Sequence, residues 1–290
     1  MSARGPVRIG LLGFFTDDCA PVTEVARLAE ERGVESLWAP EHTHIPVDYT
    51  SETPTGRALP ESYRRIFDPF VVLTAAAAAT TRIRLGTGIA LVANHDPITL
   101  AKQIATLDRI SGGRFILGVG AGWIREEIEN HGVEFETRWS RAVEHVEAMR
   151  AIWTQEKASF SGRWVNFEPL WSWPKPVQQP HPPVHFATLG PSPLVIRHAD
   201  GWLPLSNKDP AELPGRIAEL RARAEAAGRD PAGLEITVFS LGRTDAAQVE
   251  DYGAMGADRV ILRPKIGTTG ELEQFLEPYA GLLAEAGPQK

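Results

Sequence analysis

The chain has 290 residues, of which 43% are hydrophobic and 23% charged, an ordinary composition for a globular protein with a large core. Its formal net charge is -7 and no run of Lys or Arg stands out, which argues against a protein that binds nucleic acid. Cys19 is the only cysteine. The chain can therefore form neither an intrachain disulfide nor a thiolate metal cage, and a reducing, cytoplasmic environment is predicted.

The first residues lead directly into an apolar strand, without the charged region, long apolar run and cleavage site of a signal peptide. The longest apolar stretch, residues 70–79, is much shorter than the roughly 20 residues that a membrane span requires. We therefore expect a soluble protein with no membrane partner.

Short β-branched runs alternate with amphipathic segments along the chain, a pattern typical of βα units on a parallel sheet. The runs cover residues 7–13, 35–40, 82–91, 114–120, 184–188, 201–205, 234–240 and 258–263. Eight such units close a barrel. The sequence therefore predicts an α/β protein that is a single-domain (β/α)8 TIM barrel over residues 1–290.

The helices are predicted from apolar residues that share one face at helical spacing. These sets are Val22, Val25, Ala26 and Ala29; Ala142, Val146, Met149 and Trp153; Leu213, Ile217, Leu220 and Ala224; and Leu272, Phe275, Leu276 and Tyr279. Glycines at 33, 112, 113 and 228 stand where helices are expected to end. We expect the apolar faces to pack against the barrel.

Two connections are longer than a loop that only joins a strand to a helix: residues 41–67 after the second strand, and residues 159–183 before the fifth. The second contains Trp164, Trp171 and Trp173 among five prolines, which favours an ordered insertion over a flexible linker. Long ordered insertions are usually functional. Both are predicted to shape a binding site or a dimer interface.

The reacting groups of a parallel barrel lie where its strands end, on the face built from the βα loops. The second strand ends at Glu41 and His42, which places a carboxylate and an imidazole at the barrel mouth. A histidine there can hydrogen-bond a cofactor or protonate a product. The alternative is a structural histidine that caps the loop or pairs with Glu41.

Glycines interrupt the third and fourth strands, at Gly86 and Gly88 and again in the stretch 118–122. Glycine weakens a strand, so it indicates either a bulge beside a flat ligand or room for a bulky core neighbour. The spacing in the fourth strand is not the G-x-G-x-x-G of a dinucleotide-binding fold.

After the fifth strand, Gly190 and Ser192 precede a predicted helix. Backbone N–H groups there could hold a phosphate, or Ser192 could be a plain N-cap. Asp200 could simply order the turn into the sixth strand. No metal site is predicted, because apart from His42 and His44 beside Glu41 the histidines show no ligand spacing. Cys19 lies in a loop, and no nucleophile elbow is present.

Six motifs in order along the chain resemble the luciferase-like monooxygenase superfamily, in particular its actinobacterial deazaflavin-dependent oxidoreductases. They are 38–42 (WAPEH), 82–88 (RIRLGTG), 100–103 (LAKQ), 106–114 (TLDRISGGR), 118–123 (GVGAGW) and 199–202 (ADGW). The stretch 45–51 (IPVDYTS) resembles a subgroup of presumed deazaflavin enzymes. The resemblance covers nearly the whole chain.

The resemblance implies a cofactor ring in the barrel mouth against a non-proline cis peptide, which by position is Gly88–Ile89. His42, and with it Glu41, would lie near the ring and the substrate as catalytic residues. The turn of Gly120, Ala121 and Gly122 would accommodate the cofactor's chain. The residues that would flank its phosphate are Leu189, Gly190 and Ser192.

The chain departs from the family's pattern at two places. Trp123 stands where sugar-phosphate dehydrogenases of the family carry a catalytic glutamate, which argues against that chemistry. Leu189-Gly190 stands where relatives often have two glycines.

The resulting hypothesis is an oxidoreductase that uses reduced coenzyme F420 for hydride transfer to or from a small organic substrate. The alternative is an FMN-dependent monooxygenase supplied by a separate reductase, and a third possibility is a barrel that has lost catalysis and serves as a binding subunit. A homodimer is expected. The substrate is left open, because the two long connections that shape its pocket are where such families vary.

Overall fold

The architecture is that of a computed structural model, which describes residues 5–53, 58–204, 210–240 and 242–286. Eight parallel strands form a closed barrel in the order β1-β10-β9-β8-β7-β4-β3-β2. The strands are β1 Arg8–Leu12, β2 Ser36–Ala39, β3 Arg84–Thr87, β4 Phe115–Val119, β7 Val184–Phe186, β8 Gly201–Trp202, β9 Glu235–Phe239 and β10 Arg259–Leu262. The predicted TIM barrel is confirmed.

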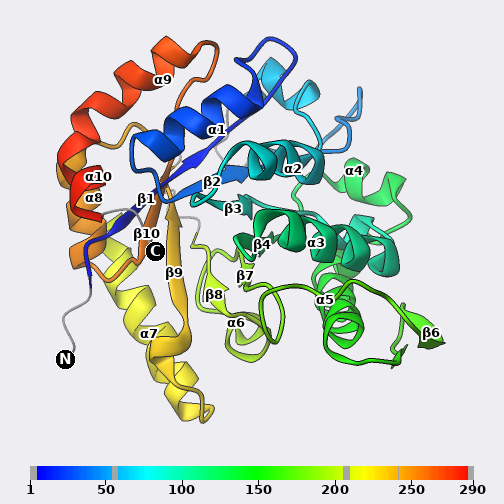
Figure 1. The fold of residues 1–290 in the computed structure, drawn as a ribbon. Helices are drawn as coiled ribbons and strands as arrows, with labels where there is room; N and C mark the ends of the chain where they lie inside the picture. The colour runs from blue at the N-terminus through cyan, green and yellow to red at the C-terminus, as the bar shows by residue number, and fades with distance from the viewer. Residues whose placement is uncertain (1–4, 54–57, 205–209, 241, 287–290) are drawn as a thin grey trace.

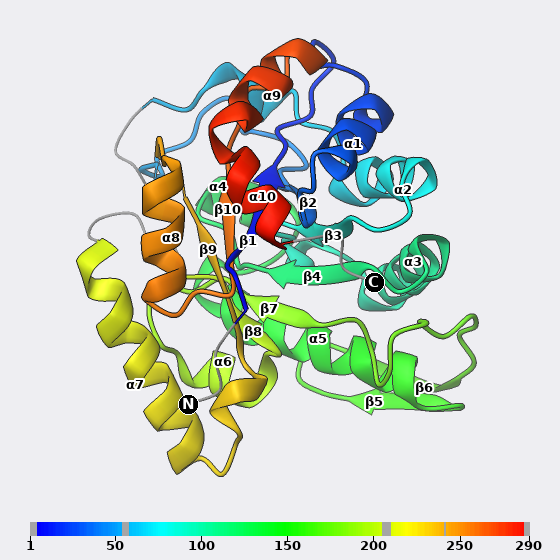
Figure 2. The same cartoon turned by 60° about the vertical axis from the view of Figure 1, so that its left-hand side comes forward.

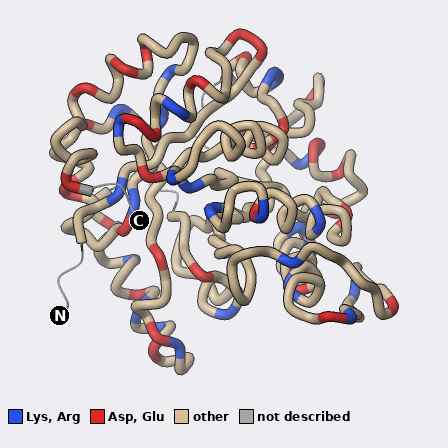
Figure 3. Tube along the Cα trace, viewed as in Figure 1, with Lys and Arg blue, Asp and Glu red and all other residues tan. Residues whose placement is uncertain are grey.

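Helices lie outside the strands and cover the barrel (Figure 1). They are α1 Val22–Glu31, α2 Pro69–Ala79, α3 Pro97–Ser111, α4 Arg125–Asn130, α5 Arg138–Thr154, α6 Pro193–His198, α7 Leu213–Ala226, α8 Ala246–Ala254, α9 Thr269–Leu276 and α10 Ala280–Ala286. Acidic and basic positions are interspersed along the outer helices (Figure 3). None of the helices in the described part of the chain is long and apolar enough to cross a membrane.

Helix α3 shows how local sequence sets the helix ends. The Asp96 side chain accepts a hydrogen bond of 2.8 Å from the Thr99 backbone N–H, and Pro97 occupies the first turn. Gly112 ends the helix with a φ of 68°, a left-handed conformation that glycine adopts without a Cβ penalty. The predicted stop at this glycine is confirmed.

Several predicted boundaries differ from the structure. The third strand is shorter than residues 82–91, because the chain turns after Thr87 and forms a 3-10 helix at Val92–Asn94. The last predicted helix ends at Leu276, and Tyr279 belongs to a separate 3-10 turn. Residue 205 of the predicted sixth strand lies outside the described residues.

The insertion at 159–183 contains an antiparallel hairpin that the sequence did not indicate, formed by β5 Ala158–Ser161 and β6 Asn166–Leu170. Figure 2 shows the hairpin extending beside α5, away from the barrel axis. Buried Asp108 of α3 holds the returning chain, since its carboxylate accepts hydrogen bonds from the backbone N–H groups of Val177, at 2.6 Å, and Gln178, at 3.0 Å. The prediction of an ordered insertion is confirmed.

The earlier insertion, residues 41–67, is described except for 54–57. It contains one 3-10 helix, η1 at Glu61–Arg64. Thr50 and Ser51 anchor it to α4 through hydrogen bonds to the Glu126 carboxylate, at 2.7 and 3.2 Å. This insertion therefore folds back over the barrel mouth, where β2 and β4 end.

The interior of the barrel has two layers of different chemistry. Toward the carboxyl ends of the strands lies an upper apolar cluster of Leu12, Trp38, Ile116, Ala187, Leu203, Phe239 and Ile261. Toward the amino ends lies a basal charged cluster of Arg8, Glu35, Arg84, His185, Glu235 and Arg259. Gly86 makes room for the upper apolar cluster, because a Cβ at this position would lie 2.3 Å from the Trp38 ring.

Candidate active site

His42 follows β2 at the carboxyl end of the barrel, as predicted, and pairs with a carboxylate far away in the sequence. Its Nδ1 lies 2.7 Å from Oε2 of Glu127 on α4, and the exposed fractions of the two side chains are 7% and 0%. The Thr43 backbone N–H donates to the other oxygen of Glu127 at 3.1 Å. Glu127 therefore fixes both the imidazole and the loop that carries it.

Aromatic rings surround this pair. The ring centroid of His42 lies 5.4 Å from that of Tyr63 and 6.2 Å from that of Trp123, the latter edge-on. Tyr63 in turn lies 5.1 Å from Phe14. Rings in this arrangement attract one another and exclude water. Trp123, one of the predicted departures from the family's pattern, thus contributes to the wall around His42.

Glu41 is buried and bonds to residues other than His42, so the alternative in which His42 pairs with Glu41 is wrong. One carboxylate oxygen accepts a hydrogen bond from the Leu91 backbone N–H at 2.6 Å, and the other lies 2.6 Å from Nε2 of His95. Burial alone would lower the pKa of His95, but the hydrogen bond and charge of Glu41 raise it above its ordinary value. Glu41 therefore ties the end of β2 to the loop after β3.

The peptide bond between Gly88 and Ile89 is cis, as the resemblance implied. Gly88 and Ile89 are half-buried, and Ile89 packs against the upper apolar cluster. A Cβ on Gly120 would lie 2.3 Å from the end of the Ile89 side chain. Gly120 therefore gives space to Ile89, while Gly122 has a φ of 77° that requires glycine.

Of the predicted phosphate-loop residues, Ser192 is an N-cap. Its hydroxyl accepts a hydrogen bond from the Leu194 backbone N–H at 3.2 Å at the start of the six-residue helix α6. Leu189 is 73% exposed, and the Gly190 carbonyl accepts from the Thr188 hydroxyl at 2.8 Å. Asp200 orders the start of β7, since its carboxylate accepts from the Val184 backbone N–H at 2.9 Å.

Histidines gather at the rim, where the Thr43 hydroxyl lies 2.9 Å from Nδ1 of His44 and 2.7 Å from Nε2 of His131. Burial, followed by the charge of His44, lowers the pKa of His131. Within the described ranges, no group of three or more His, Cys, Asp or Glu residues could hold a metal ion.

Sequence reasoning missed Glu127, although a signal was present. Ile124, Glu127 and Ile128 stand at positions i, i+3 and i+4, and all three are buried. A carboxylate at an apolar position of a helix needs a buried partner. His42, 85 residues away in the chain, is that partner.

The closed barrel with a histidine–carboxylate pair at its carboxyl end has the architecture of the TIM-barrel enzymes. The family model described as luciferase-like monooxygenase matches residues 5–286. The chain therefore belongs to the luciferase-like monooxygenase family, whose members are oxidoreductases and monooxygenases.

Among its relatives is an uncharacterized protein of Mycobacterium tuberculosis, 46% identical over 95% of this chain and 98% of that protein. The FMNH2-dependent dimethylsulfone monooxygenase of Pseudomonas putida is 31% identical over 52% of this chain and 42% of that protein. The F420-dependent hydroxymycolic acid dehydrogenase of Mycobacterium tuberculosis is 28% identical over 72% of this chain and 55% of that protein.

Among solved structures, an F420-dependent secondary alcohol dehydrogenase in complex with an F420-acetone adduct superposes with a TM-score of 0.76. Its sequence is 19% identical, and the match covers 97% of this chain and 99% of that one. The similarity supports the fold.

Proposed function

We propose that this protein is an oxidoreductase that binds reduced coenzyme F420 at the barrel mouth and transfers a hydride between it and a small organic substrate. The observation that carries the proposal is the buried pair of His42 and Glu127 at the carboxyl end of the strands. The F420-dependent relative supports the choice of cofactor.

The pair determines which nitrogen of His42 handles a proton. An ionised carboxylate only accepts hydrogen bonds, so Glu127 keeps the proton of the imidazole on Nδ1. The remaining nitrogen, Nε2, has no hydrogen bond to any described residue. It is therefore the atom that gives a proton to the substrate or takes one from it.

A bound reduced deazaflavin supplies the hydride, and the protein supplies the matching proton. On reduction of a carbonyl substrate to an alcohol, the imidazolium form of His42 would give its Nε2 proton to the substrate oxygen. In the reverse direction the neutral imidazole of His42 would take the hydroxyl proton on Nε2, and an oxidised deazaflavin would be the hydride acceptor. Glu127 balances the positive charge of the imidazolium.

The residues at the mouth fit a flat ring. Phe14 and Ile89 are half-buried and pack on the upper apolar cluster, so they offer an apolar surface where the strands end. Tyr63 and Trp123 exclude water on the His42 side. The roles predicted for Glu41 as a catalytic residue and for Gly88, Ile89, Gly120–Gly122, Leu189, Gly190 and Ser192 as cofactor-binding residues are part of this proposal.

A second candidate is a monooxygenase that uses reduced FMN and oxygen, with a separate reductase that supplies the cofactor. It is favoured by the similarity to the FMNH2-dependent relative. The same His42 and Glu127 pair would then orient the ring and carry the proton.

Anaerobic titration of the purified protein with F420 and with FMN, followed by fluorescence and absorbance, decides between the two candidates. We expect F420 to bind with a Kd at least about tenfold lower than that of FMN. Binding of FMN in the micromolar range without binding of F420 would overturn the first proposal in favour of the second.

The catalytic pair is tested with His42→Ala and Glu127→Gln, with His44→Ala as the matched control at the rim. Loss of an orienting carboxylate or of a proton carrier lowers turnover by about 10²- to 10⁴-fold. We expect both variants to lose turnover to this extent while still binding the cofactor. Unchanged turnover in His42→Ala would contradict the assignment.

We also propose that a single domain covers residues 1–290 and that the protein is a cytoplasmic homodimer. Large apolar side chains are exposed on α2 and on the chain after β6, where Val71, Trp171 and Trp173 are 70%, 69% and 57% exposed. These exposed apolar side chains support the proposal of a protein interface. Sedimentation velocity of the wild type and of a Trp171→Ser/Trp173→Ser variant tests the dimer, and a monomeric wild type would contradict it.

A further inference from the structure

Arg263 directly follows β10 and continues the inward-facing positions of that strand to the barrel mouth. Side chains alternate between the two faces of a strand, so Arg259, Ile261 and Arg263 share one face. Arg259 lies in the basal charged cluster and Ile261 in the upper apolar cluster. Arg263 comes next in this order, above the upper apolar cluster, at the end of the barrel that carries His42.

An aromatic ring that follows the neighbouring strand holds the guanidinium of Arg263. Its central carbon lies 4.0 Å from the ring centroid of Phe14, which packs on the upper apolar cluster and follows β1, the strand that pairs with β10. From Phe14 the wall continues through Tyr63 to His42, at centroid distances of 5.1 and 5.4 Å. Arg263 therefore belongs to the same wall of the mouth as His42.

The positive charge of Arg263 is not matched by a counter-ion in the described part of the chain. The residue is half-buried, and its guanidinium makes no hydrogen bond or ion pair with any described residue. Asp17 and Asp18, in the loop after β1, pair instead with Arg65, at 2.7 and 3.3 Å. Stacking on a ring occupies one face of a guanidinium and leaves the N–H groups along its edge unused. These donors are available to a ligand in the mouth.

The other polar groups of this wall also favour a ligand that accepts hydrogen bonds. Glu41 and Glu127 are already hydrogen-bonded within the protein. The hydroxyl of Tyr63, like Nε2 of His42, has no hydrogen bond to any residue that the structure describes. Both groups can donate, and Arg263 only donates. Donors with one net positive charge and no free carboxylate beside them are complementary to an anion.

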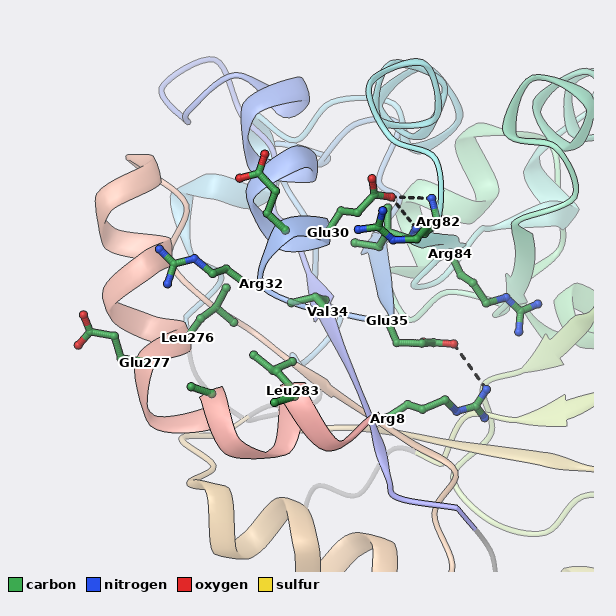
Figure 4. Close-up of a pocket in the computed structure, with 15 residues that line it drawn as sticks. Arg8, Glu30, Arg32, Val34, Glu35, Arg82, Arg84, Leu276, Glu277 and Leu283 are labelled. Carbon is green, nitrogen blue, oxygen red and sulfur yellow. Dashed lines mark hydrogen bonds and ion pairs between the residues drawn. The ribbon is translucent and has the colours of Figure 1, made fainter. Parts of the chain in front are cut away.

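The cavity of about 520 Å³ at the amino end of the barrel differs from the mouth in this respect (Figure 4). Four arginines and four glutamates line it, so its charges balance. Arg8 lies 3.5 Å from Glu35, and the Glu30 carboxylate accepts a hydrogen bond from the Arg82 backbone N–H at 2.6 Å. The uncompensated cation is therefore at the mouth, beside the proposed reaction.

We propose that Arg263 selects the substrate, which is a small oxo acid or the corresponding hydroxy acid whose carboxylate pairs with this arginine. The inference rests on the proposed function, in which His42 exchanges a proton with the reacting oxygen. Reduction adds a hydride to the carbonyl carbon and a proton to its oxygen, and leaves the carboxylate unchanged. Arginine presents parallel N–H groups that match a carboxylate in geometry. A substrate held at one end by Arg263 and at the other by His42 has a fixed orientation.

The probes are 4-oxopentanoate and 6-oxoheptanoate, each compared with its neutral methyl ester. Their Kd values for the full-length protein are measured by isothermal titration calorimetry, with oxidised F420 and without it. We expect the wild type to bind at least one of the acids about tenfold or more tightly than its ester, because the ester cannot pair with Arg263. The absence of this preference for both acids in both conditions would overturn the inference.

Variants locate the binding of the acid. Arg263→Met removes the charge, and we expect it to bind the acid about tenfold or more weakly while its affinity for the ester is unchanged. Arg263→Lys keeps the charge but not the parallel N–H groups, so its affinity for the acid should lie between those of the wild type and Arg263→Met. Arg243→Met is the matched control, because Arg243 is an exposed arginine in the neighbouring loop after β9. Equal losses in Arg243→Met and in the Arg263 variants would refute the assignment.

Titration of the same variants with F420 separates this inference from the proposed function. The phosphate of the cofactor is also an anion, but we expect Arg263→Met to bind F420 as the wild type does. Loss of F420 binding with unchanged binding of the acid would assign Arg263 to the cofactor and overturn the inference. A wild type that prefers the acid to its ester but does not bind F420 would contradict the choice of cofactor and leave the carboxylate site at Arg263 supported.

Discussion

His185 makes the stability of the barrel sensitive to mild acid. The side chain is 1% exposed, and its Nδ1 has no hydrogen-bond partner among the residues that the structure describes. Burial, followed by the charges of Arg259 and Arg84, lowers its pKa from 6.5 to about 4, against the opposing charge of Glu235. The perturbation that tests this account is His185→Leu, which fills the space with an apolar side chain that cannot titrate.

The sign follows from the two pKa values. Above pH 6.5 the histidine is neutral in both the folded and the unfolded chain, so it contributes no pH dependence. Between pH 6.5 and about pH 4 the unfolded chain binds a proton that the folded chain does not. The free energy of unfolding therefore decreases as the pH is lowered through this range. From pH 7 to pH 5 this loss amounts to about 2 kcal/mol.

The assay is urea denaturation at pH 8, 7, 6 and 5, at one protein concentration, followed by tryptophan fluorescence. The free energy of unfolding of the wild type should fall by about 2 kcal/mol more than that of His185→Leu between pH 7 and pH 5. His181→Leu, which removes a half-buried histidine elsewhere, should behave as the wild type does. The same pH dependence in the wild type and His185→Leu would refute the reasoning.

Three further substitutions test the packing and the ion pairs of the barrel interior. Gly118→Ala would place a Cβ 2.0 Å from the Thr87 carbonyl oxygen, and we expect it to lower the free energy of unfolding by about 2–3 kcal/mol. Gly215→Ala in α7, where nothing lies within 4 Å, should instead raise it by up to about 1 kcal/mol; equal effects would contradict the packing argument. Arg259→Met leaves buried Glu35 and half-buried Glu235 without their main partner, and should lower the free energy of unfolding in urea denaturation by about 3–5 kcal/mol. A loss below 1 kcal/mol would show that the ion pairs contribute little.

The local pattern of apolar residues and glycines predicted the helices and the turns well. The apolar faces of α1, α5 and α7 are buried as expected, because a helix must turn its apolar stripe toward the core. Turn glycines such as Gly33 and Gly228 have positive φ, a requirement that the sequence reveals residue by residue. The predicted ends of the third strand were less accurate, because tertiary contacts rather than β-propensity determine where β3 stops pairing with its neighbours.

The site was predicted only in part. His42 was found because position at the end of a parallel strand is a matter of chain order. Its partner Glu127 and the partner of Glu41, His95, were not found, since they come from other βα units. Side chains from separate units meet only when the barrel closes. A single sequence does not show which residues of distant strands lie side by side.

By itself, the sequence determined the eight βα units, the ordered insertions and the residues that end each strand, because periodicity and turn chemistry are local properties. Tertiary structure alone decided which charges meet. Closure of the barrel brings Glu35 and Glu235 onto Arg259. It also buries His185, whose Nδ1 has no hydrogen-bond partner in the described part of the chain. Burial and charge pairing depend on neighbours across the barrel, and these neighbours exist only after all eight strands have closed.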